Sequence, residues 1–266
     1  MADDSILILG CGNMGGAMLA GWLAAGLDPA RFTVVDPFLA AAPAGVRLLR
    51  AVPPETFAVV LLGVKPQSFD EAAAALAPAI NPQTVLLSIL AGVELASIAA
   101  RLPGAGAMVR VMPNLAAAIG KSPLGLYAVG LDQAGRAQVE QLLAPLGHPE
   151  WLEHEGQLDA VTALAGSGPA FVYRIIEALA EGGAQLGLDP AQAQRLALAM
   201  VEGAAALAAT SGEAPAQLAQ RVTSPGGTTA AGLAVLDDEA ALAQLIAATL
   251  RAARDRGAEL AVAARS

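Results

Sequence analysis

The first half of the chain alternates short apolar runs with stretches of helical spacing. Short apolar runs bounded by glycine, proline or acidic residues predict buried strands. They lie at Ser5–Leu9, Phe32–Val35, Ala58–Val64, Thr84–Ile89 and Met108–Val111, with helices predicted between them at Met14–Ala25, Asp70–Leu76 and Leu95–Arg101. Because strands that alternate with helices form βαβ units, this half is predicted to be an α/β domain with a mostly parallel sheet.

The second half shows no strand pattern after Trp151 and is predicted to be helical. One long helix is expected at Leu158–Leu186, and Asp189-Pro190 supplies the cap and first turn of the next helix. Further helices are expected at Pro215–Arg221 and from Ala230 to near the end. The change of pattern divides the chain into an α/β domain, 1–155, and an all-α domain, 156–266.

The composition suits a core of small aliphatic side chains. Of the 266 residues, 55% are hydrophobic and only 3% are aromatic. Abundant alanine and glycine therefore let helices pack closely within or between subunits. The net charge is −9 and no run of Lys or Arg stands out. Nucleic acid is not expected as a partner, because phosphate binding needs a basic surface.

The mean hydropathy of +0.55 raises the question of membrane spans. Polar residues, glycine and proline interrupt every apolar stretch before it reaches the roughly 20 residues that a spanning helix needs. The acidic start of the chain lacks the basic region of a signal peptide. Cys11 is the single cysteine and has no partner for an internal disulfide. A cytoplasmic protein without a membrane partner is expected.

A glycine motif follows the first predicted strand and opens the first predicted helix. The segment Gly10-Cys11-Gly12-Asn13-Met14-Gly15 has the spacing G-x-G-x-x-G. In this context Gly10 permits a tight turn, Gly12 lets the backbone approach a pyrophosphate, and the helix N-terminus attracts the anion. Asn13, Met14 and Gly15 belong to the same candidate cofactor site. The alternative is a glycine-rich turn that holds no ligand.

Asp36 ends the second predicted strand, about 20 residues after the glycine motif, where an acid can accept hydrogen bonds from the ribose hydroxyls of NAD. A 2′-phosphate would meet a negative charge there. Nearby bases are sparse, since Arg31 precedes the strand and Arg47 lies well beyond it. The residues therefore indicate a weak preference for NAD(H) over NADP(H). The alternative is that Asp36-Pro37 only starts a turn.

Val64, Lys65 and Pro66 follow the third predicted strand. The carboxyl ends of strands in an open α/β sheet face the ligand crevice. Lys65 is therefore a candidate for contact with the cofactor phosphates or the nicotinamide, and its alternative is an ordinary surface lysine.

A loop rich in small residues, Ser224-Pro225-Gly226-Gly227-Thr228-Thr229, leads directly into the last predicted helix. Backbone N–H groups in such a loop form an anion site to which the helix N-terminus adds positive potential. A carboxylate or phosphate would fit, with two threonine hydroxyls beside it. A plain helix N-cap is the alternative, although one residue would suffice for that role.

No metal site is expected. His148 and His154 lie in a turn-like stretch around Pro149, and no Cys or Glu–His constellation accompanies them.

Five segments together resemble pyrroline-5-carboxylate reductases, in the order in which that family carries its motifs. They are Gly10–Gly15, Val64–Gln67, Arg110–Asn114, Asp159–Ala170 and Val222–Thr229. The resemblance spreads over most of the chain, and Gly166–Ala170 and Ser224–Thr229 are its specific parts. It implies a Rossmann domain followed by an all-helical domain that joins two subunits in a homodimer or a higher homo-oligomer.

The resemblance also implies an activity in proline biosynthesis. A reductase of this family transfers a hydride from NADH or NADPH to the C=N bond of 1-pyrroline-5-carboxylate and forms L-proline. Thr229 would be the catalytic residue, hydrogen-bonded to the ring nitrogen in a positional role. Ser224 belongs to the substrate loop, in which the N–H groups of Gly226, Gly227 and Thr228 would bind the substrate carboxylate.

Two positions depart from the family pattern. Leu115-Ala116 stands where the family usually has Thr-Pro after Met-Pro-Asn, and Asp36 stands where many members favour NADPH. A reductase of a related cyclic imine therefore stays an alternative, as does a non-catalytic NAD-binding regulatory protein. A β-hydroxyacid dehydrogenase is disfavoured, because no lysine follows Lys121 to serve as its catalytic residue.

Overall fold

The computed structural model describes residues 5–263, with side chains through Glu259. It contains two compact units, which are described separately. The first comprises residues 5–166 together with residues 254–263, and the second is Ser167–Ala253. The division of the chain near residue 155 stays a prediction. No described helix is both long and apolar enough to cross a membrane.

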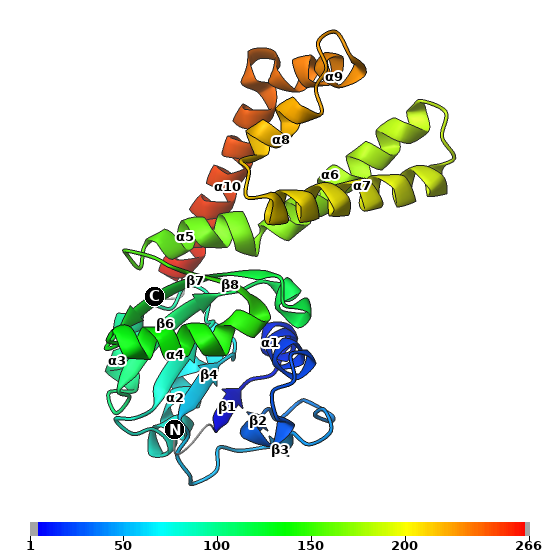
Figure 1. Ribbon diagram of the computed structural model, residues 1–266. Coiled ribbons are helices and arrows are strands. Elements are labelled where there is room, and N and C mark those ends of the chain that lie inside the picture. The colour runs from blue at the N-terminus through cyan, green and yellow to red at the C-terminus, as the bar shows by residue number, and fades with distance from the viewer. Residues whose placement is uncertain (1–4, 264–266) are drawn as a thin grey trace. The chain divides into compact units, whose positions relative to one another are not determined.

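The first unit is built on an eight-stranded sheet of order β3-β2-β1-β4-β5-β6-β7-β8 (Figure 1). All neighbouring strands are parallel except β6 and β7. The strands are β1 (Ile6–Leu9), β2 (Phe32–Val35), β3 (Arg47–Leu49), β4 (Val59–Leu62), β5 (Val85–Ser88), β6 (Ala107–Met112), β7 (Ser122–Val129) and β8 (Gly147–Trp151). The predicted mostly parallel α/β architecture is therefore confirmed.

Helices cover both faces of this sheet. Side chains of α1 (Asn13–Ala24) and α4 (Gln133–Leu143) pack on one face, and those of α2 (Phe69–Leu76) and α3 (Leu95–Arg101) pack on the other. Alternate residues of β1 divide between the two cores, since Ile6 and Ile8 join the first and Leu7 and Leu9 the second. Burial on both faces explains why the central strands are apolar throughout rather than alternating.

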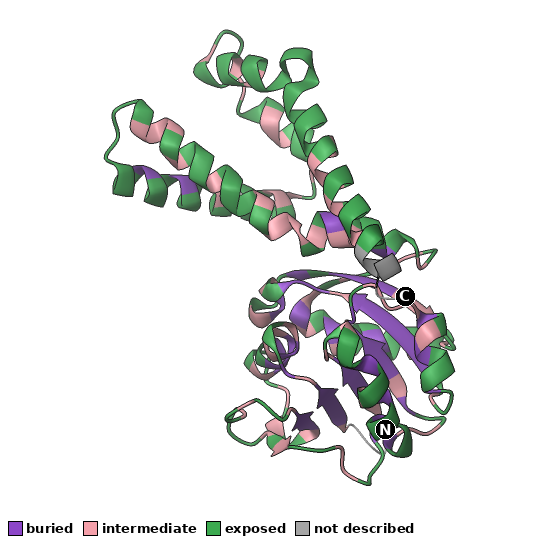
Figure 2. Cartoon of the chain, turned by 180° about the vertical axis from the view of Figure 1, so that it is seen from behind, coloured by how far each residue is buried: buried purple, intermediate pink, exposed green. Residues whose placement is uncertain are grey.

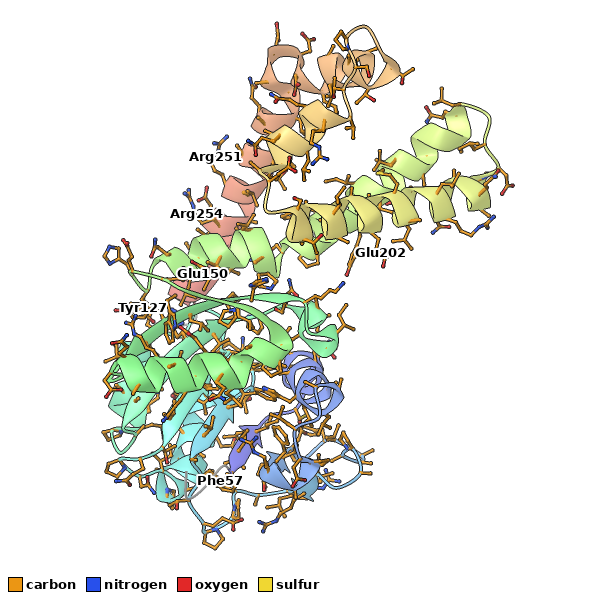
Figure 3. The ribbon with its side chains drawn as sticks, viewed as in Figure 1. Phe57, Tyr127, Glu150, Glu202, Arg251 and Arg254 are labelled. Carbon is orange, nitrogen blue, oxygen red and sulfur yellow. The ribbon has the colours of Figure 1, made fainter. Side chains whose placement is uncertain are left out.

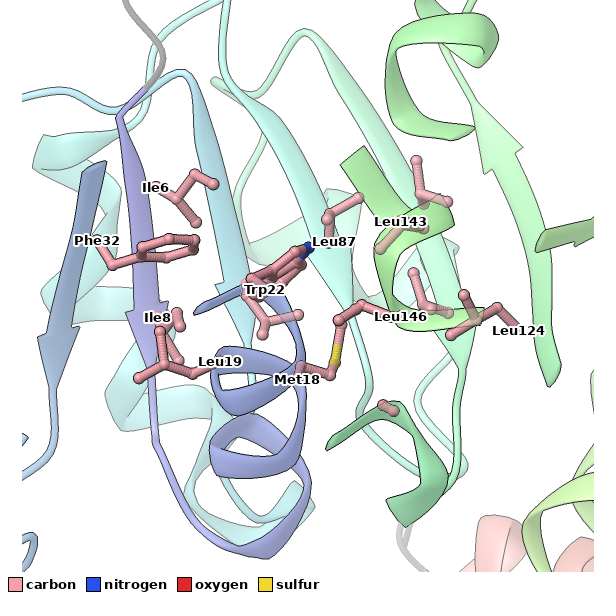
Figure 4. Close-up of a cluster of buried hydrophobic side chains, with 14 of the residues drawn as sticks. Ile6, Ile8, Met18, Leu19, Trp22, Phe32, Leu87, Leu124, Leu143 and Leu146 are labelled. Atoms are coloured by element: carbon pink, nitrogen blue, oxygen red, sulfur yellow. The ribbon is translucent and has the colours of Figure 1, made fainter. Parts of the chain in front are cut away.

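Trp22 organises the first of these cores (Figure 4). Its ring stacks on Phe32, with the ring centroids 5.6 Å apart. Its indole Nε1–H donates to the carbonyl oxygen of Leu142 at 2.8 Å. One large side chain thus packs α1 against β2 and ties it to α4, which suits a chain with few aromatic residues.

The second unit is helical. It contains α6 (Gly168–Gln185), α7 (Pro190–Ser211), α8 (Pro215–Arg221), α9 (Thr228–Asp237) and the first part of α10 (Ala241–Ala263). The carboxylate of Asp189 accepts a hydrogen bond from the N–H of Gln192, so the predicted cap of α7 is confirmed. Gly183 of α6 lies close to Ala193 of α7, where an added Cβ would be 3.4 Å from the alanine methyl group.

Little of the second unit is buried within the chain. Purple, the colour of buried residues, is concentrated on the sheet of the first unit, whereas the helices of the second unit are mostly green (Figure 2). Ala193 and Ala197 are its buried residues among those described. Side chains project from these helices, as Glu202 of α7 and Arg251 of α10 illustrate (Figure 3).

Two predicted helices are interrupted in the structure. The helix expected at Leu158–Leu186 consists of α5 (Gln157–Val161), a π-helical turn η6 (Thr162–Gly166) and α6. Pro169 causes part of this break, because it has no N–H to donate to the carbonyl of Ala165. The last predicted helix is α9 and α10, separated at Asp238–Ala240, where Glu239 and Ala240 have positive φ.

The sequence prediction missed β3, β7, β8 and α4. β3 is three residues long and lies at an edge of the sheet, and β8 has only partly buried or exposed residues. β7 carries Pro123 and Gly125, two residues that argue against a strand. α4 is polar over most of its length and was not recognised among the turn signals around it.

Candidate active site

The glycine motif forms the turn between β1 and α1, and two of its glycines are required by packing. Gly10 has φ +86°, and a Cβ on it would lie 2.8 Å from the carbonyl carbon of Gly63 and the nitrogen of Val64. A Cβ on Gly15 would lie 2.7 Å from the carbonyl oxygen of Gly10. The turn therefore sits directly against the end of β4 and could not accept side chains at these positions.

Gly12 faces open space, in contrast to Gly10 and Gly15. A Cβ added at Gly12 would have no atom of the other described residues within 4 Å, apart from its immediate chain neighbours and the backbone of its own helix. Gly12 is also the N-cap of α1, and no side chain caps this helix. The N–H groups of Asn13 and Met14 in the first turn thus keep their hydrogen-bonding capacity toward the open side. An uncapped helix N-terminus behind a glycine fits the pyrophosphate of a dinucleotide.

Asp36, at the end of β2, contacts this turn directly. Its Oδ2 accepts a hydrogen bond from the N–H of Cys11 at 2.9 Å. Its Oδ1 accepts from the N–H of Phe38 at 2.8 Å and from that of Leu39 at 3.1 Å. The carboxylate therefore fixes both the glycine turn and its own loop, and Oδ2 keeps one lone pair for a further donor.

Arg50 is the residue at this edge that the sequence analysis did not consider. It follows β3 directly, and its Nη1 donates to the carbonyl oxygens of Asp36 at 2.9 Å and Leu39 at 2.7 Å. The strand that brings it there was not predicted, so distance in sequence concealed its proximity to Asp36. The pairing of β2 with β3 is the signal that would have found it.

The three candidate residues after β4 lie beside the same turn. The nitrogen of Val64 would be 2.8 Å from a Cβ on Gly10. Lys65 is exposed and precedes a short 3₁₀ turn that Pro66 begins. The segment is thus at the carboxyl end of the strand next to β1, where ligands bind in open α/β sheets.

Cys11 lies inside the glycine turn and is buried in the core. Burial raises the pKa of its thiol, and the negative charge of Asp36 raises that pKa further. A protonated, buried thiol is a poor nucleophile, so Cys11 serves packing rather than chemistry.

Asn114 connects the loop after β6 to the π-helical turn. Its Nδ2 donates to the carbonyl oxygen of Ala165 at 3.0 Å, and its Oδ1 accepts from the N–H of Ala116 at 2.9 Å. Asn114 thereby supplies the hydrogen bond that Pro169 cannot give to Ala165. The second contact caps the 3₁₀ helix η4 (Leu115–Ile119), which includes the unusual Leu115-Ala116 pair.

The substrate-loop candidates belong to the second unit. Gly226 has φ +70°, and the N–H of Gly227 donates to the carbonyl oxygen of Ser224 at 3.0 Å. Gly227 is the N-cap of α9, and no side chain caps the helix. The hydroxyls of Thr228 and Thr229 are therefore not used as caps, and both residues are exposed within the chain. The N–H of Gly227 is already engaged in the turn.

The two histidines are exposed and lie in β8 and in the segment after it. Among the described residues, no cluster of three or more His, Cys, Asp or Glu side chains could hold a metal ion. The absence of a metal stays a prediction.

The sheet order, the glycine turn and the uncapped start of α1 are those of the Rossmann class of dinucleotide-binding folds. Residues 5–92 match the family described as coenzyme F420-dependent NADP oxidoreductase. Residues 155–260 match the family described as pyrroline-5-carboxylate reductase dimerisation.

Similar proteins cover almost the whole chain. A pyrroline-5-carboxylate reductase of Pseudomonas aeruginosa is 39% identical over 98% of both chains. One from Methanosarcina acetivorans is 35% identical over 98% of this chain and 99% of its own. The solved structure of one from Coxiella burnetii is 32% identical, covers 96% of this chain and 98% of its own, and superposes with a TM-score of 0.89.

The chain belongs to the pyrroline-5-carboxylate reductase family. It is an NAD(P)H-dependent oxidoreductase with pyrroline-5-carboxylate reductase activity, and its helical region is a dimerisation domain of a homo-oligomer. The resemblance in the sequence is thereby confirmed, and the alternatives of another cyclic imine reductase and of a non-catalytic protein are set aside.

Proposed function

We propose that the glycine turn holds the cofactor, that the loop before α9 holds the substrate, and that Thr229 acts at the reacting nitrogen. The reaction is the reduction of the C=N bond of 1-pyrroline-5-carboxylate to L-proline. The observation that carries these roles is that both helix starts, those of α1 and α9, follow glycines and lack any side-chain cap. Each start therefore keeps donors for an anionic group.

The cofactor roles are divided among three segments. The N–H groups that follow Gly12 receive the pyrophosphate, with Asn13, Met14 and Gly15 forming the first turn of the helix. Val64, Lys65 and Pro66 line the neighbouring strand end, where the charge of Lys65 attracts the cofactor phosphates. When bound, the reduced nicotinamide supplies the hydride that the imine carbon receives.

The substrate carboxylate lies at the start of α9. Because the N–H of Gly227 donates to Ser224, the remaining donors are the N–H groups of Gly226 and Thr228. Ser224 and Gly227 shape the turn that presents them. The positive end of the helix dipole adds to the attraction.

Thr229 positions the imine nitrogen. As the C=N bond is reduced, the nitrogen must hold a proton, and the Thr229 hydroxyl can hydrogen-bond it and relay that proton from water. A threonine hydroxyl is a weak acid, so its contribution is orientation. Holding the imine carbon in line with the hydride donor supplies most of the acceleration.

Asp36 gives the enzyme a weak preference for NADH. The free lone pair on Oδ2 can accept from one ribose hydroxyl, whereas a 2′-phosphate would lie near the carboxylate charge. The helical domain joins the subunits into a homodimer or a higher homo-oligomer. The cytoplasmic location stays a prediction.

Replacement of Thr229 tests its role. Thr229→Ala should lower kcat/KM for pyrroline-5-carboxylate by roughly 10²-fold, within the range of a positioned proton-transfer partner, and leave the Kd of NADH unchanged. Thr229→Ser should restore most of the activity, because it returns the hydroxyl. Thr223→Ala is the matched control, since the hydroxyl of Thr223 already donates a hydrogen bond to the carbonyl oxygen of Ala219 in α8. Full turnover by Thr229→Ala would remove Thr229 from the mechanism.

A further inference from the structure

We propose that Arg50 is the coenzyme-specificity residue of this reductase and binds the 2′-phosphate of NADPH, so that the enzyme uses both nicotinamide cofactors. The inference rests on the proposed cofactor site and deepens it. It assigns a cation to the adenosine end of the site, where Asp36 alone would favour NADH.

The position of Arg50 follows from the sheet. β2 and β3 are parallel neighbours, so the residues after them, Asp36 and Arg50, come from adjacent strand ends on one edge of the sheet. The N–H of Asp36 donates to the carbonyl of Leu49 at 3.2 Å, which extends this pairing to the residue before Arg50. The loop after β2 is the place where Rossmann proteins distinguish a ribose hydroxyl from a 2′-phosphate.

Arg50 keeps the capacity to bind an anion. Only its Nη1 is engaged among the described residues, with the carbonyls of Asp36 and Leu39. Nη2 and Nε have no partner among those residues, and the side chain is exposed. Two other arginines of the first unit are neutralised, since Arg47 pairs with Glu55 and Arg101 with Asp70. Arg50 forms no ion pair with a described carboxylate.

The carboxylate of Asp36 leaves the guanidinium of Arg50 available, because its contacts are with backbone N–H groups rather than with Arg50. Three backbone N–H groups donate to its carboxylate, and both oxygens point to those donors. Such donors hold the carboxylate in place. Arg50 is held on the carbonyl side of the same loop by two hydrogen bonds, so its planar group is pre-organised for a phosphate.

Binding of cofactor fragments tests the proposal without any hydride transfer. The full-length enzyme and its variants are titrated calorimetrically with 2′-phospho-ADP-ribose and with ADP-ribose, in the absence of pyrroline-5-carboxylate. Arg50→Met should weaken the binding of 2′-phospho-ADP-ribose about tenfold or more, which is the magnitude of one charge-assisted hydrogen bond. It should change the affinity for ADP-ribose by less than about twofold. Arg50→Lys keeps a point charge but loses the planar fork, so its loss should be intermediate.

Arg47→Met is the matched control, because Arg47 begins β3, the strand that Arg50 follows, and pairs with Glu55. This variant should bind both ligands with the affinity of the unaltered enzyme. If Arg50→Met loses affinity for both ligands equally, Arg50 only holds the loop in place and the proposal is wrong. An unchanged affinity for 2′-phospho-ADP-ribose would also overturn the proposal. If neither fragment binds the unaltered enzyme, the proposed cofactor site itself fails, which is a different result.

Discussion

Asp36 illustrates how the structural contacts of one side chain can leave it available for the recognition role that we propose for it. Its carboxylate holds the glycine turn through Cys11 and its own loop through Phe38 and Leu39, while one lone pair stays available to a ribose hydroxyl. The residue pattern leaves two roles open for Asp36, which are formation of a turn and contact with the ribose. The turn-forming contacts are present, and they leave room for the second role.

Replacing Asp36 should alter cofactor choice and stability at once. Asp36→Ser removes a charge close to the 2′ position, so the ratio of kcat/KM for NADPH to that for NADH should rise about tenfold, or about 1.4 kcal/mol. The melting temperature should fall, because the backbone donors lose their acceptor. Parallel steady-state assays and thermal melts measure the two effects.

Asp28→Ser is the matched control for this change. Asp28 also accepts a backbone hydrogen bond, from the N–H of Ala30, but it precedes β2 rather than following it. It should lower stability slightly and leave the cofactor ratio alone. If Asp36→Ser has the cofactor ratio of the unaltered enzyme, Asp36 does not read the ribose.

Some residue roles were readable from sequence and others were not. The glycine turn was readable because only glycine fits a positive φ beside a neighbouring backbone, as at Gly10. Arg50 was not, because its place depends on the pairing of β2 with a three-residue edge strand. The engagement of the Gly227 N–H likewise depends on the folded turn rather than on residue type.

At the scale of elements, the strongly apolar strands were predicted and the weakly patterned ones were not. Phe32–Val35 and Leu95–Arg101 have the predicted bounds, since the burial of their apolar residues agrees there with the local pattern. β7 was missed because Pro123 and Gly125 argue against a strand, although pairing with β6 and β8 overrides them. The glycines and proline of residues 166–169 were a visible signal for the break before α6.

A buried ion pair joins three elements of the first unit. Arg110 of β6 donates to Oε1 of Glu155 at 2.9 Å, and the same oxygen accepts from the N–H of Leu95, at the start of α3. The side chain of Arg110 is 7% exposed and that of Glu155 is 24% exposed. The pair therefore fixes the segment that leads into α5 to β6, an inner strand of the sheet.

Glu155→Gln should destabilise the first unit by about 3 kcal/mol, because it leaves the guanidinium buried without a counter-charge. The amide oxygen of Gln can still accept from Leu95, so the change isolates the charge. Denaturant unfolding at several protein concentrations measures the loss. Glu55→Gln is the matched control: it breaks the exposed pair with Arg47 and should cost less than about 1 kcal/mol. If both variants lose the same small amount of unfolding free energy, the Arg110–Glu155 pair does not fix the segment before α5.

At the scale of the whole molecule, the second unit has almost no hydrophobic core of its own within one chain. Among its described residues only Ala193 and Ala197 are buried, while many large apolar side chains are exposed. Leu196, Met200 and Leu207 are spaced for one face of α7 and are 52%, 51% and 59% exposed. Such a surface on a dimerisation domain indicates burial against another copy.

Charge on this face should break the assembly. Leu207→Glu should shift the enzyme toward monomer at micromolar concentration, since a carboxylate would be desolvated on association. Gln194→Glu, which adds the same charge to an already polar position of α7, should leave the assembly intact. Analytical ultracentrifugation distinguishes the two, and a dimer of Leu207→Glu with the stability of the unaltered dimer would argue against this face as the interface.

The division of the chain into an α/β part and a helical part was predictable, because strand and helix patterns change at about the same place. The activity was predictable from short motifs, of which Gly166–Ala170 and Ser224–Thr229 are the specific ones. The apolar exposure of α7 was not predictable, since sequence pattern alone does not separate a core from an interface.

The measurement that tests the account most directly is the absorbance of NADH and NADPH, followed in parallel with pyrroline-5-carboxylate and with chromatographic detection of proline. We expect oxidation of both cofactors with formation of one proline for each cofactor consumed, and a modest excess of kcat/KM for NADH. Oxidation of neither cofactor under conditions in which both bind would contradict the account.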